Sequence, residues 1–249
     1  MIKTIDLNAD LGEECGDDAA LMAVISSANI ACGGHAGDDE TMSEALTLAQ
    51  SHGVSAGAHP SYPDREGFGR RKMDISLEDL RRSLTNQVSQ LAEIARKSGL
   101  SMTHIKPHGA LYHDAAADLD LARTLAEICL DHTSGKLLVG PPVGAMVQAA
   151  AEIGVRYMAE GFVDRSYTDD GKLMARNEAG AVLEELTVKC AQAVSLALDA
   201  TVMTRSGKMI DLPVQTICLH GDHPGAADAG VAVRQALEEA GVTVKAMGQ

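Results

Sequence analysis

The sequence predicts an α/β fold built on seven parallel strands. Short aliphatic segments alternate with longer amphipathic ones along all 249 residues, which is typical of successive βα units. Polar residues gather just after the short segments, at the strand ends where parallel α/β folds build their sites. No Pro- or Ser-rich linker interrupts this alternation. We therefore predict a single domain over residues 1–249.

The expected strands are short runs of aliphatic residues bounded by glycine, proline or polar residues. They span Thr4–Leu11, Ala28–Cys32, Val54–His59, Met102–His108, Leu137–Gly140, Tyr157–Val163 and Thr216–His220. Units of this number can close into a barrel or lie open as a doubly wound sheet. Polar residues follow nearly every strand, which favours the barrel, because loops at one rim of a barrel converge on a single cavity.

Between the strands, apolar residues recur at intervals of three or four, which predicts helices that pack on the sheet. The clearest helix begins after Ser76 with a capping-type start and ends near Gly99. Further helices are expected at about Thr41–His52, Leu119–Asp131, Gly144–Ile153, Ala179–Asp199 and Ala227–Ala240. The segment Val202–Leu212 contains a Ser-Gly pair and predicts a β-hairpin before the last core strand.

The composition argues against several classes of partner. The formal net charge is −14 and no long basic run occurs, so a nucleic acid would be repelled. No apolar run is long enough to cross a membrane, and no secretory-type leader is present. The five cysteines are scattered and form no CxxC motif, which favours reduced thiols and a cytoplasmic location.

The first strand carries polar residues on one face. Asp6, Asn8 and Asp10 alternate with leucine and alanine, so their side chains point the same way. Such a face is unusual for a strand buried in a parallel sheet. A solvated edge strand is the alternative explanation. Glu13 follows in the next loop.

Histidines and an arginine follow the second and third strands. His35 comes after two glycines, which let a backbone approach a ligand closely, and a packing role for it is difficult to find. His59 ends the third strand, and Arg70 lies in the glycine-rich loop beyond it. These three residues are candidates for a site at the strand ends.

The fourth strand places His104, Lys106 and His108 on one side. A lysine that points into a parallel sheet is costly unless it has a charged partner. Beside carboxylates, Lys106 could act as a proton donor or an electrostatic clamp. It is therefore a strong candidate for the site.

The last two core strands end in further ionisable residues. Glu160 and Arg165 belong to the sixth strand and its loop, and His220 and Asp222 follow the seventh. A lone histidine is more often structural than catalytic. Structural roles are a less satisfactory explanation when acids, bases and cations occur together at five or six strand ends. This joint pattern predicts a catalytic pocket.

No recognisable nucleotide-binding loop is present. Three lysines follow glycine, at Gly135-Lys136, Gly171-Lys172 and Gly207-Lys208, and each is followed by leucine or methionine instead of serine or threonine. None completes a phosphate-binding P-loop, and no GxGxxG fingerprint occurs.

Ordered motif blocks resemble those of the LamB/YcsF family. They include Asp6-Leu7-Asn8-Ala9-Asp10-Leu11-Gly12-Glu13, His35-Ala36-Gly37-Asp38, Gly57-Ala58-His59-Pro60-Ser61-Tyr62-Pro63-Asp64, Gly67-Phe68-Gly69-Arg70, Lys106-Pro107-His108-Gly109-Ala110-Leu111-Tyr112, Ala159-Glu160-Gly161-Phe162, Asp164-Arg165, Tyr167-Thr168-Asp169-Asp170-Gly171 and His220-Gly221-Asp222. The blocks occur in family order from residue 6 to residue 225, so the resemblance covers essentially the whole chain. Cys15, Gly34 and His223 depart from the residues most usual in the family.

The resemblance implies a seven-stranded (β/α) barrel of the glycoside hydrolase/deacetylase type. It also implies activity as the A component of a three-subunit 5-oxoprolinase, which opens 5-oxo-L-proline to L-glutamate with ATP hydrolysis. The expected partners are the other two components, B and C. Because this chain lacks a nucleotide loop, we hypothesise that the partners bind ATP. The sequence leaves homo-oligomerisation open.

The two lines of reasoning together predict two sets of residues. The catalytic set is Asp10, His59, Lys106, His108, Glu160 and His220, and the substrate-binding set is Asn8, Glu13, His35, Arg70, Arg165 and Asp222. Asp10, Glu160 or His59 would serve as general base. Lys106 and Arg70 would offset anionic charge. His108 or His220 would protonate the departing nitrogen.

Two alternative functions stay open at this point. One is a metal-dependent hydrolase similar to polysaccharide deacetylases, in which Asp10, His35, His59 and His220 hold a divalent ion. The other is a non-catalytic regulatory protein that uses the barrel only for binding.

Overall fold

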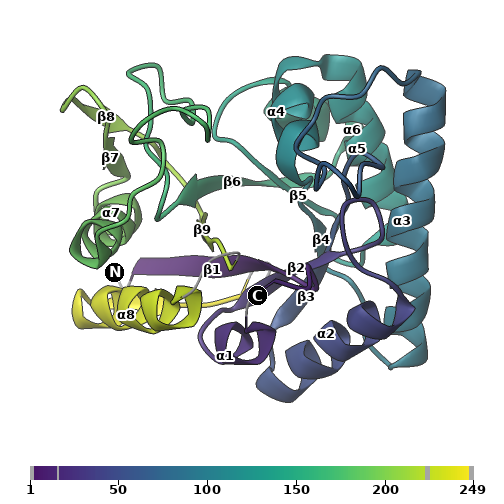
Figure 1. Cartoon of the computed structure of the whole chain (residues 1–249), viewed down its shortest axis with the longest axis horizontal. Helices are drawn as coiled ribbons and strands as arrows, with labels where there is room; N and C mark the ends of the chain where they lie inside the picture. Colours follow the sequence, from purple (N-terminus) through teal and green to yellow (C-terminus); the bar gives the residue numbers. More distant parts are fainter. Residues whose placement is uncertain (1–2, 16, 222–224, 247–249) are drawn as a thin grey trace.

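Seven parallel strands close into a barrel in the computed structural model, which describes residues 3–15, 17–221 and 225–246 (Figure 1). The barrel strands are β1 (Lys3–Leu11), β2 (Ser27–Ala31), β3 (Ser55–His59), β4 (His104–Ile105), β5 (Leu137–Gly140), β6 (Arg156–Phe162) and β9 (Thr216–Leu219). Each strand pairs with its neighbour in this order, and β9 pairs with both β6 and β1 to close the ring. The predicted seven-stranded (β/α) barrel is confirmed.

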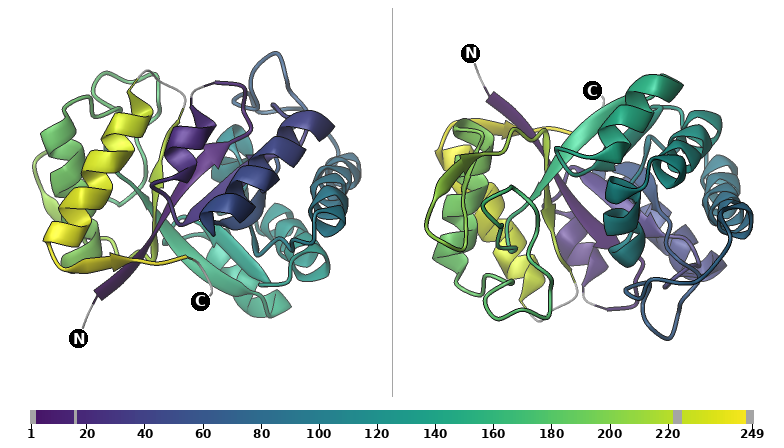
Figure 2. Two further views of the ribbon diagram at one scale, coloured as in Figure 1. Left: turned by 90° about the horizontal axis from the view of Figure 1, so that it is seen from below. Right: turned by 90° about the horizontal axis from the view of Figure 1, so that it is seen from above.

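Helices surround the barrel on its outside (Figures 1 and 2). Those that the sequence predicts are α2 (Asp39–His52), α3 (Leu77–Lys97), α5 (Leu119–His132), α6 (Ala145–Ile153), α7 (Leu186–Leu198) and α8 (Ala226–Glu239). The antiparallel hairpin of β7 (Thr201–Met203) and β8 (Met209–Asp211) is also as predicted. None of the helices in the described ranges is long and apolar enough to cross a membrane.

Some predicted boundaries were wrong. The helix expected from Ala179 begins at Leu186, because the preceding residues hydrogen-bond to the segment after β6: the Leu183 amide donates to the Asp164 carbonyl at 2.8 Å. The strand expected to reach His108 ends at Ile105, since Pro107 has no amide to donate. The short helices α1 (Asp18–Met22) and α4 (Gly109–Ala117), and the strand β10 (Val242–Val244) beside β1, were missed.

Helix α3 shows how the predicted patterns fold. The Ser76 hydroxyl accepts a hydrogen bond from the Asp79 amide at 3.1 Å and begins the helix. Its apolar stripe, which includes Leu84 and Val88, is buried against the barrel. Gln87 lies on the same buried face, and its side-chain amide hydrogen-bonds to both the amide and the carbonyl of Ser61, each at 3.0 Å. The helix thereby fixes the loop that follows β3.

The interior of the barrel is polar. Interiors of (β/α) barrels are usually filled by branched aliphatic residues, and here the aliphatic core instead lies largely between strands and helices. A hydrogen-bonded layer of Asp6, Asn8, Asn29, His104 and Thr216 occupies the interior, with contacts of 2.5–2.9 Å between successive members. Asp6 is 2% exposed and Asn8 is fully buried. The edge-strand explanation of the first strand is therefore wrong.

Gly57 makes room for this layer. A Cβ atom at Gly57 would lie 2.3 Å from the ring of His104, which is closer than real Cβ atoms approach. The ring can therefore reach across β3 to the side chain of Asn29, where His104 Nε2 and Asn29 Oδ1 are 2.9 Å apart. Burial lowers the pKa of His104 to about 3, so this histidine is neutral and structural.

Candidate active site

A cavity of about 530 Å³ opens where the strands end. Its walls include Asp10, Glu13, His59, Arg70, Lys106, His108, Arg165 and His220 from the predicted sets. Asn8, His35 and Glu160 are buried beside these residues and do not line the cavity. Asp222 lies outside the described residues. Most of the predicted site residues are thus brought together at one rim of the barrel, as the alternation of strands and polar loops predicted.

Lys106 is buried between two carboxylates. Its Nζ lies 2.9 Å from Asp10 Oδ1 and 2.9 Å from Glu160 Oε1, and the side chain is 2% exposed. Burial by itself would lower the pKa of the amine. The negative charges of Asp10 and Glu160 contribute to raising that pKa well above its ordinary value. Lys106 is therefore a permanent cation at the base of the cavity.

Asp10 connects this lysine to a histidine. Its other oxygen, Oδ2, lies 3.2 Å from His59 Nε2. Burial would raise the pKa of Asp10, but the charges of His59 and Lys106 hold it well below its usual range. Asp10 is consequently ionised at neutral pH. It can orient a water molecule in the cavity and accept a proton once strong charge develops nearby.

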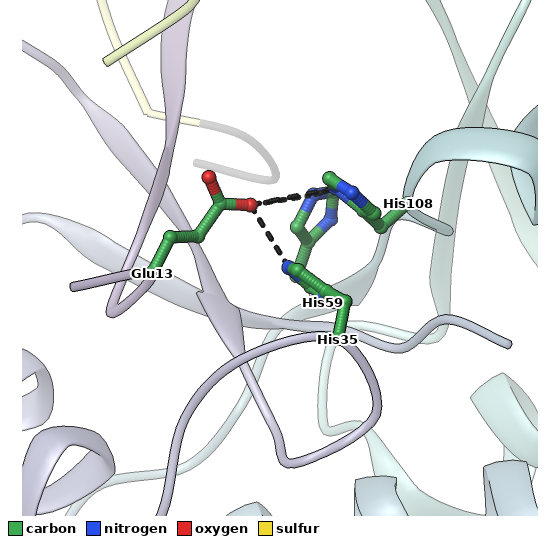
Figure 3. A group of neighbouring side chains, drawn as sticks. All are labelled: Glu13, His35, His59 and His108. Atoms are coloured by element: carbon green, nitrogen blue, oxygen red, sulfur yellow. Dashed lines mark hydrogen bonds and ion pairs between the residues drawn. The ribbon is translucent and has the colours of Figure 1, made fainter. Parts of the chain in front are cut away.

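Three histidines and Glu13 form a cluster (Figure 3), and one of these histidines, His59, contacts Asp10. The rings of His35 and His108 stack with centroids 3.7 Å apart, and His59 meets both rings edge-on. Burial lowers the pKa of His35 to about 2 and that of His108 well below its ordinary value. His35 and His108 are therefore neutral imidazoles at neutral pH.

His220 forms a dyad with Asp164. The Nδ1 atom of His220 donates to the Asp164 carboxylate, 2.8 Å from one oxygen and 2.9 Å from the other, and the ring stacks on Phe162. Burial would lower the pKa of His220, but Asp164 raises it above its ordinary value. A protonated imidazole next to the cavity is suited to give a proton to a leaving group.

The role of Asp164 was missed in the predicted sets. The residue lies two positions after the end of β6, and that position was a signal that could have found it. What the sequence does not show is its partner, because His220 lies after a different strand.

Replacing Asp164 with asparagine is expected to lower the pKa of His220, since the carboxylate is what raises it. Stabilisation by the ion pair is fully present between the ordinary Asp pKa of about 3.9 and the ordinary His pKa of about 6.5, and it is lost as the pH rises through the raised pKa of His220. Within that window we expect a loss of about 3–5 kcal/mol in the free energy of unfolding. NMR titration of the His220 ring and urea unfolding at several pH values measure both effects. An unchanged His220 pKa in the variant would contradict the dyad.

Arginines surround the cavity in two ways. Arg165 is buried, and its guanidinium donates to the carbonyls of Met174 and Ala181, so it holds the loop that forms one wall. Arg70 is exposed at the rim, with its guanidinium 4.9 Å from the centre of the Phe68 ring. Lys72 and Arg176, which the sequence-based reasoning missed, also line the cavity. The rim is therefore cationic although the chain is acidic overall, which suits an anionic small molecule.

The structure regroups the predicted metal ligands. His35 and His59 cluster with Glu13 and His108, whereas Asp10 and His220 cluster with Cys218. The predicted set of Asp10, His35, His59 and His220 thus falls into two groups. The regrouping arises because β1 ends at Leu11 and the chain turns at Gly12, with a φ of 72°, which brings Glu13 to 2.9 Å from His35.

Comparison with known proteins gives one consistent family. The model of the LamB/YcsF family matches residues 5–249. A protein of Methylococcus capsulatus, named as the A subunit of 5-oxoprolinase, is 44% identical over 100% of this chain and 97% of its own length. A Pyrococcus furiosus protein of the same name is 41% identical over 98% of each chain.

Solved structures agree with this result. The lactam utilization protein from Thermus thermophilus superposes with a TM-score of 0.92 at 36% identity, over 98% of this chain and 100% of that one. The polysaccharide deacetylase Bc1974 from Bacillus cereus shares the fold, with a TM-score of 0.52 at 14% identity over 98% of this chain and 91% of that one. On the family match and these identities, the chain belongs to the LamB/YcsF family.

Proposed function

We propose that the cavity binds 5-oxo-L-proline and that this chain, with two partner subunits and ATP, opens the lactam to L-glutamate. The observation that carries the proposal is that a buried cation, Lys106, and an ionised carboxylate, Asp10, line the same cavity as His220, the histidine that pairs with Asp164. Relatives more than 40% identical over nearly their whole length are named as the A subunit of 5-oxoprolinase, which supports this choice of substrate.

The cavity offers complementary charge for each end of the substrate. 5-Oxoproline carries a carboxylate, which would contact the cationic rim formed by Arg70, Lys72 and Arg176. Its lactam oxygen would face Lys106, whose ammonium group offsets negative charge that develops on that oxygen. Glu160 does not line the cavity, so it acts by holding Lys106 in place.

A lactam is a stabilised amide, and ATP provides the drive to open it. Transfer of the γ-phosphoryl group to the lactam oxygen releases ADP and makes the ring carbon more electrophilic. Water oriented by Asp10 then adds to that carbon, the C–N bond breaks, and the nitrogen takes a proton from His220. The resulting acyl phosphate is hydrolysed by a second water to glutamate and phosphate. The B and C partners bind the ATP in this scheme, because no P-loop or GxGxxG motif occurs in this chain.

Reconstitution with the two expected partners tests the proposal. We expect glutamate to form from 5-oxoproline only when all three chains and ATP are present. We also expect the isolated chain to bind 5-oxoproline in isothermal titration calorimetry. Arg123→Ala is a suitable control, since Arg123 pairs with Asp120 and Glu152 on exposed helix surfaces. Absence of both 5-oxoproline binding and ATP-dependent glutamate formation would overturn the proposal.

A further inference from the structure

We propose that Glu13, His35, His59 and His108 form a binding site for one divalent transition metal ion, of the type that Zn²⁺ and Co²⁺ represent. The inference does not depend on the lactam being the substrate. It rests on four donor atoms that all lie within 4.8 Å of one another (Figure 3). Glu13 and His35 follow β1 and β2, His59 is the last residue of β3, and His108 directly precedes α4.

The spacing of the donor atoms suits a metal ion. His35 Nε2 and Glu13 Oε1 are 2.9 Å apart, and His59 Nε2 and His108 Nδ1 are 3.0 Å apart. Glu13 Oε1 lies a further 3.4 Å from His108 Nδ1 and 3.9 Å from His59 Nε2. Ligands at about 2.0–2.2 Å from a tetrahedral Zn²⁺ are separated by about 3.4 Å. The four measured distances, from 2.9 to 3.9 Å, lie on either side of this ligand–ligand separation.

Hydrogen bonds to backbone carbonyls fix which nitrogens carry lone pairs. His59 Nδ1 donates to the Lys106 carbonyl at 2.7 Å, and His108 Nε2 donates to the Phe68 carbonyl at 2.9 Å. In the form that binds a metal, each ring has its lone pair on the other nitrogen. Those two nitrogens, His59 Nε2 and His108 Nδ1, face each other at 3.0 Å. Two facing lone pairs repel each other, and a shared cation removes the repulsion.

The same hydrogen bonds are those that orient metal-binding histidines. Such histidines almost always donate their second N–H to a carbonyl or carboxylate, which fixes the ring and raises its basicity as a ligand. Phe68 holds its carbonyl against His108 from a left-handed backbone conformation, with a φ of 53°, which is strained for a residue with a bulky side chain. Its ring also packs edge-on against His35 and His108. The loop is thus shaped to hold these rings.

Ordinary structural roles do not account for His35. Its ring is buried, and within the described part of the chain its Nδ1 has no hydrogen-bond partner. A buried polar atom without a hydrogen-bond partner is destabilising, so His35 is not explained by packing and hydrogen bonding within the fold. Glu13, His59 and His108 also line the cavity, so an ion held here would face it and could accept a water or substrate oxygen as a further ligand.

Metal titration of the purified full-length chain tests the site. After treatment with a chelator, we expect one equivalent of Co²⁺ to bind and to give a d–d absorption spectrum, and one equivalent of Zn²⁺ to displace it. We also expect Zn²⁺ to raise the melting temperature, because a ligand that binds only the folded state stabilises it. His108→Ala should weaken Zn²⁺ binding by about 100-fold or more.

The matched control is His113→Ala, which removes a nearby histidine, within α4, that does not belong to the four-residue cluster. It should bind Zn²⁺ like the unchanged chain. If His108→Ala fails to fold, Glu13→Gln tests the same site, since it keeps the size of the side chain and removes its charge. Failure of the unchanged chain to bind stoichiometric Zn²⁺ or Co²⁺ would overturn the proposal. Equal affinity in a folded ligand variant would do so as well. Neither result depends on lactam turnover.

Discussion

Replacing Lys106 with methionine is expected to abolish lactam opening and to lower the free energy of unfolding by about 3–5 kcal/mol. The ammonium group is 2.9 Å from both Asp10 and Glu160, and its removal leaves two buried carboxylates without their cation. Urea unfolding measures the stability, and glutamate formation in the reconstituted complex measures the activity. Full activity of a Lys106→Ala or Lys106→Met chain would remove the central element of the proposed function.

The pH dependence of this effect has a defined sign. The pKa of Asp10 is held well below its usual range in the folded chain, in part by Lys106. Stability from that interaction is present above the ordinary Asp pKa of about 3.9 and is lost as the pH falls through the lowered value. The loss caused by Lys106→Met should therefore be largest at neutral pH and decrease in acid. The double variant Lys106→Met/Glu160→Gln should recover part of the stability and none of the activity.

Replacing His220 with glutamine is expected to lower kcat for glutamate formation by about 10²- to 10⁴-fold, the usual contribution of one general acid. The affinity for 5-oxoproline should change little, because the substrate carboxylate is expected to contact the cationic rim and not this ring. Steady-state kinetics and calorimetry measure the two quantities separately. His52→Gln, at the exposed end of α2, is the control.

The same experiment has a pH signature. Asp164 raises the pKa of His220, so the protonated form persists to higher pH than for an ordinary histidine. Activity that needs this acid should fall as the pH rises through the raised pKa, and His220→Gln should remove that alkaline decline. An alkaline decline that persists unchanged in the variant would assign the proton to another group.

The structure of the first strand shows how far a sequence pattern reaches. Alternation alone correctly placed Asp6, Asn8 and Asp10 on one face, because side chains in a strand alternate by geometry. Whether that face was solvated or internal depended on the neighbours of β1. The closed ring places β1 between β2 and β9, so the polar face is enclosed. The side chains that hydrogen-bond to this polar face belong to other strands, so they could not be predicted from β1 itself.

The sequence by itself determined the order of the seven barrel strands and of the six longer helices, the β-hairpin, and the placement of reactive residues at strand ends. These features depend on local periodicity and on turn residues, which act within a few positions along the chain. It also supplied the identity of the buried cation, since a lysine within an apolar strand pattern requires charged partners.

Only the tertiary structure decided which residues act together. Glu13 joins His35, His59 and His108 because a turn at Gly12 and the closure of the barrel bring separate strand ends within hydrogen-bond distance. Asp164 raises the pKa of His220 for the same reason. Electrostatic and hydrogen-bond energies depend on separations of a few ångströms and on burial, and those quantities exist only once the ring of strands has closed.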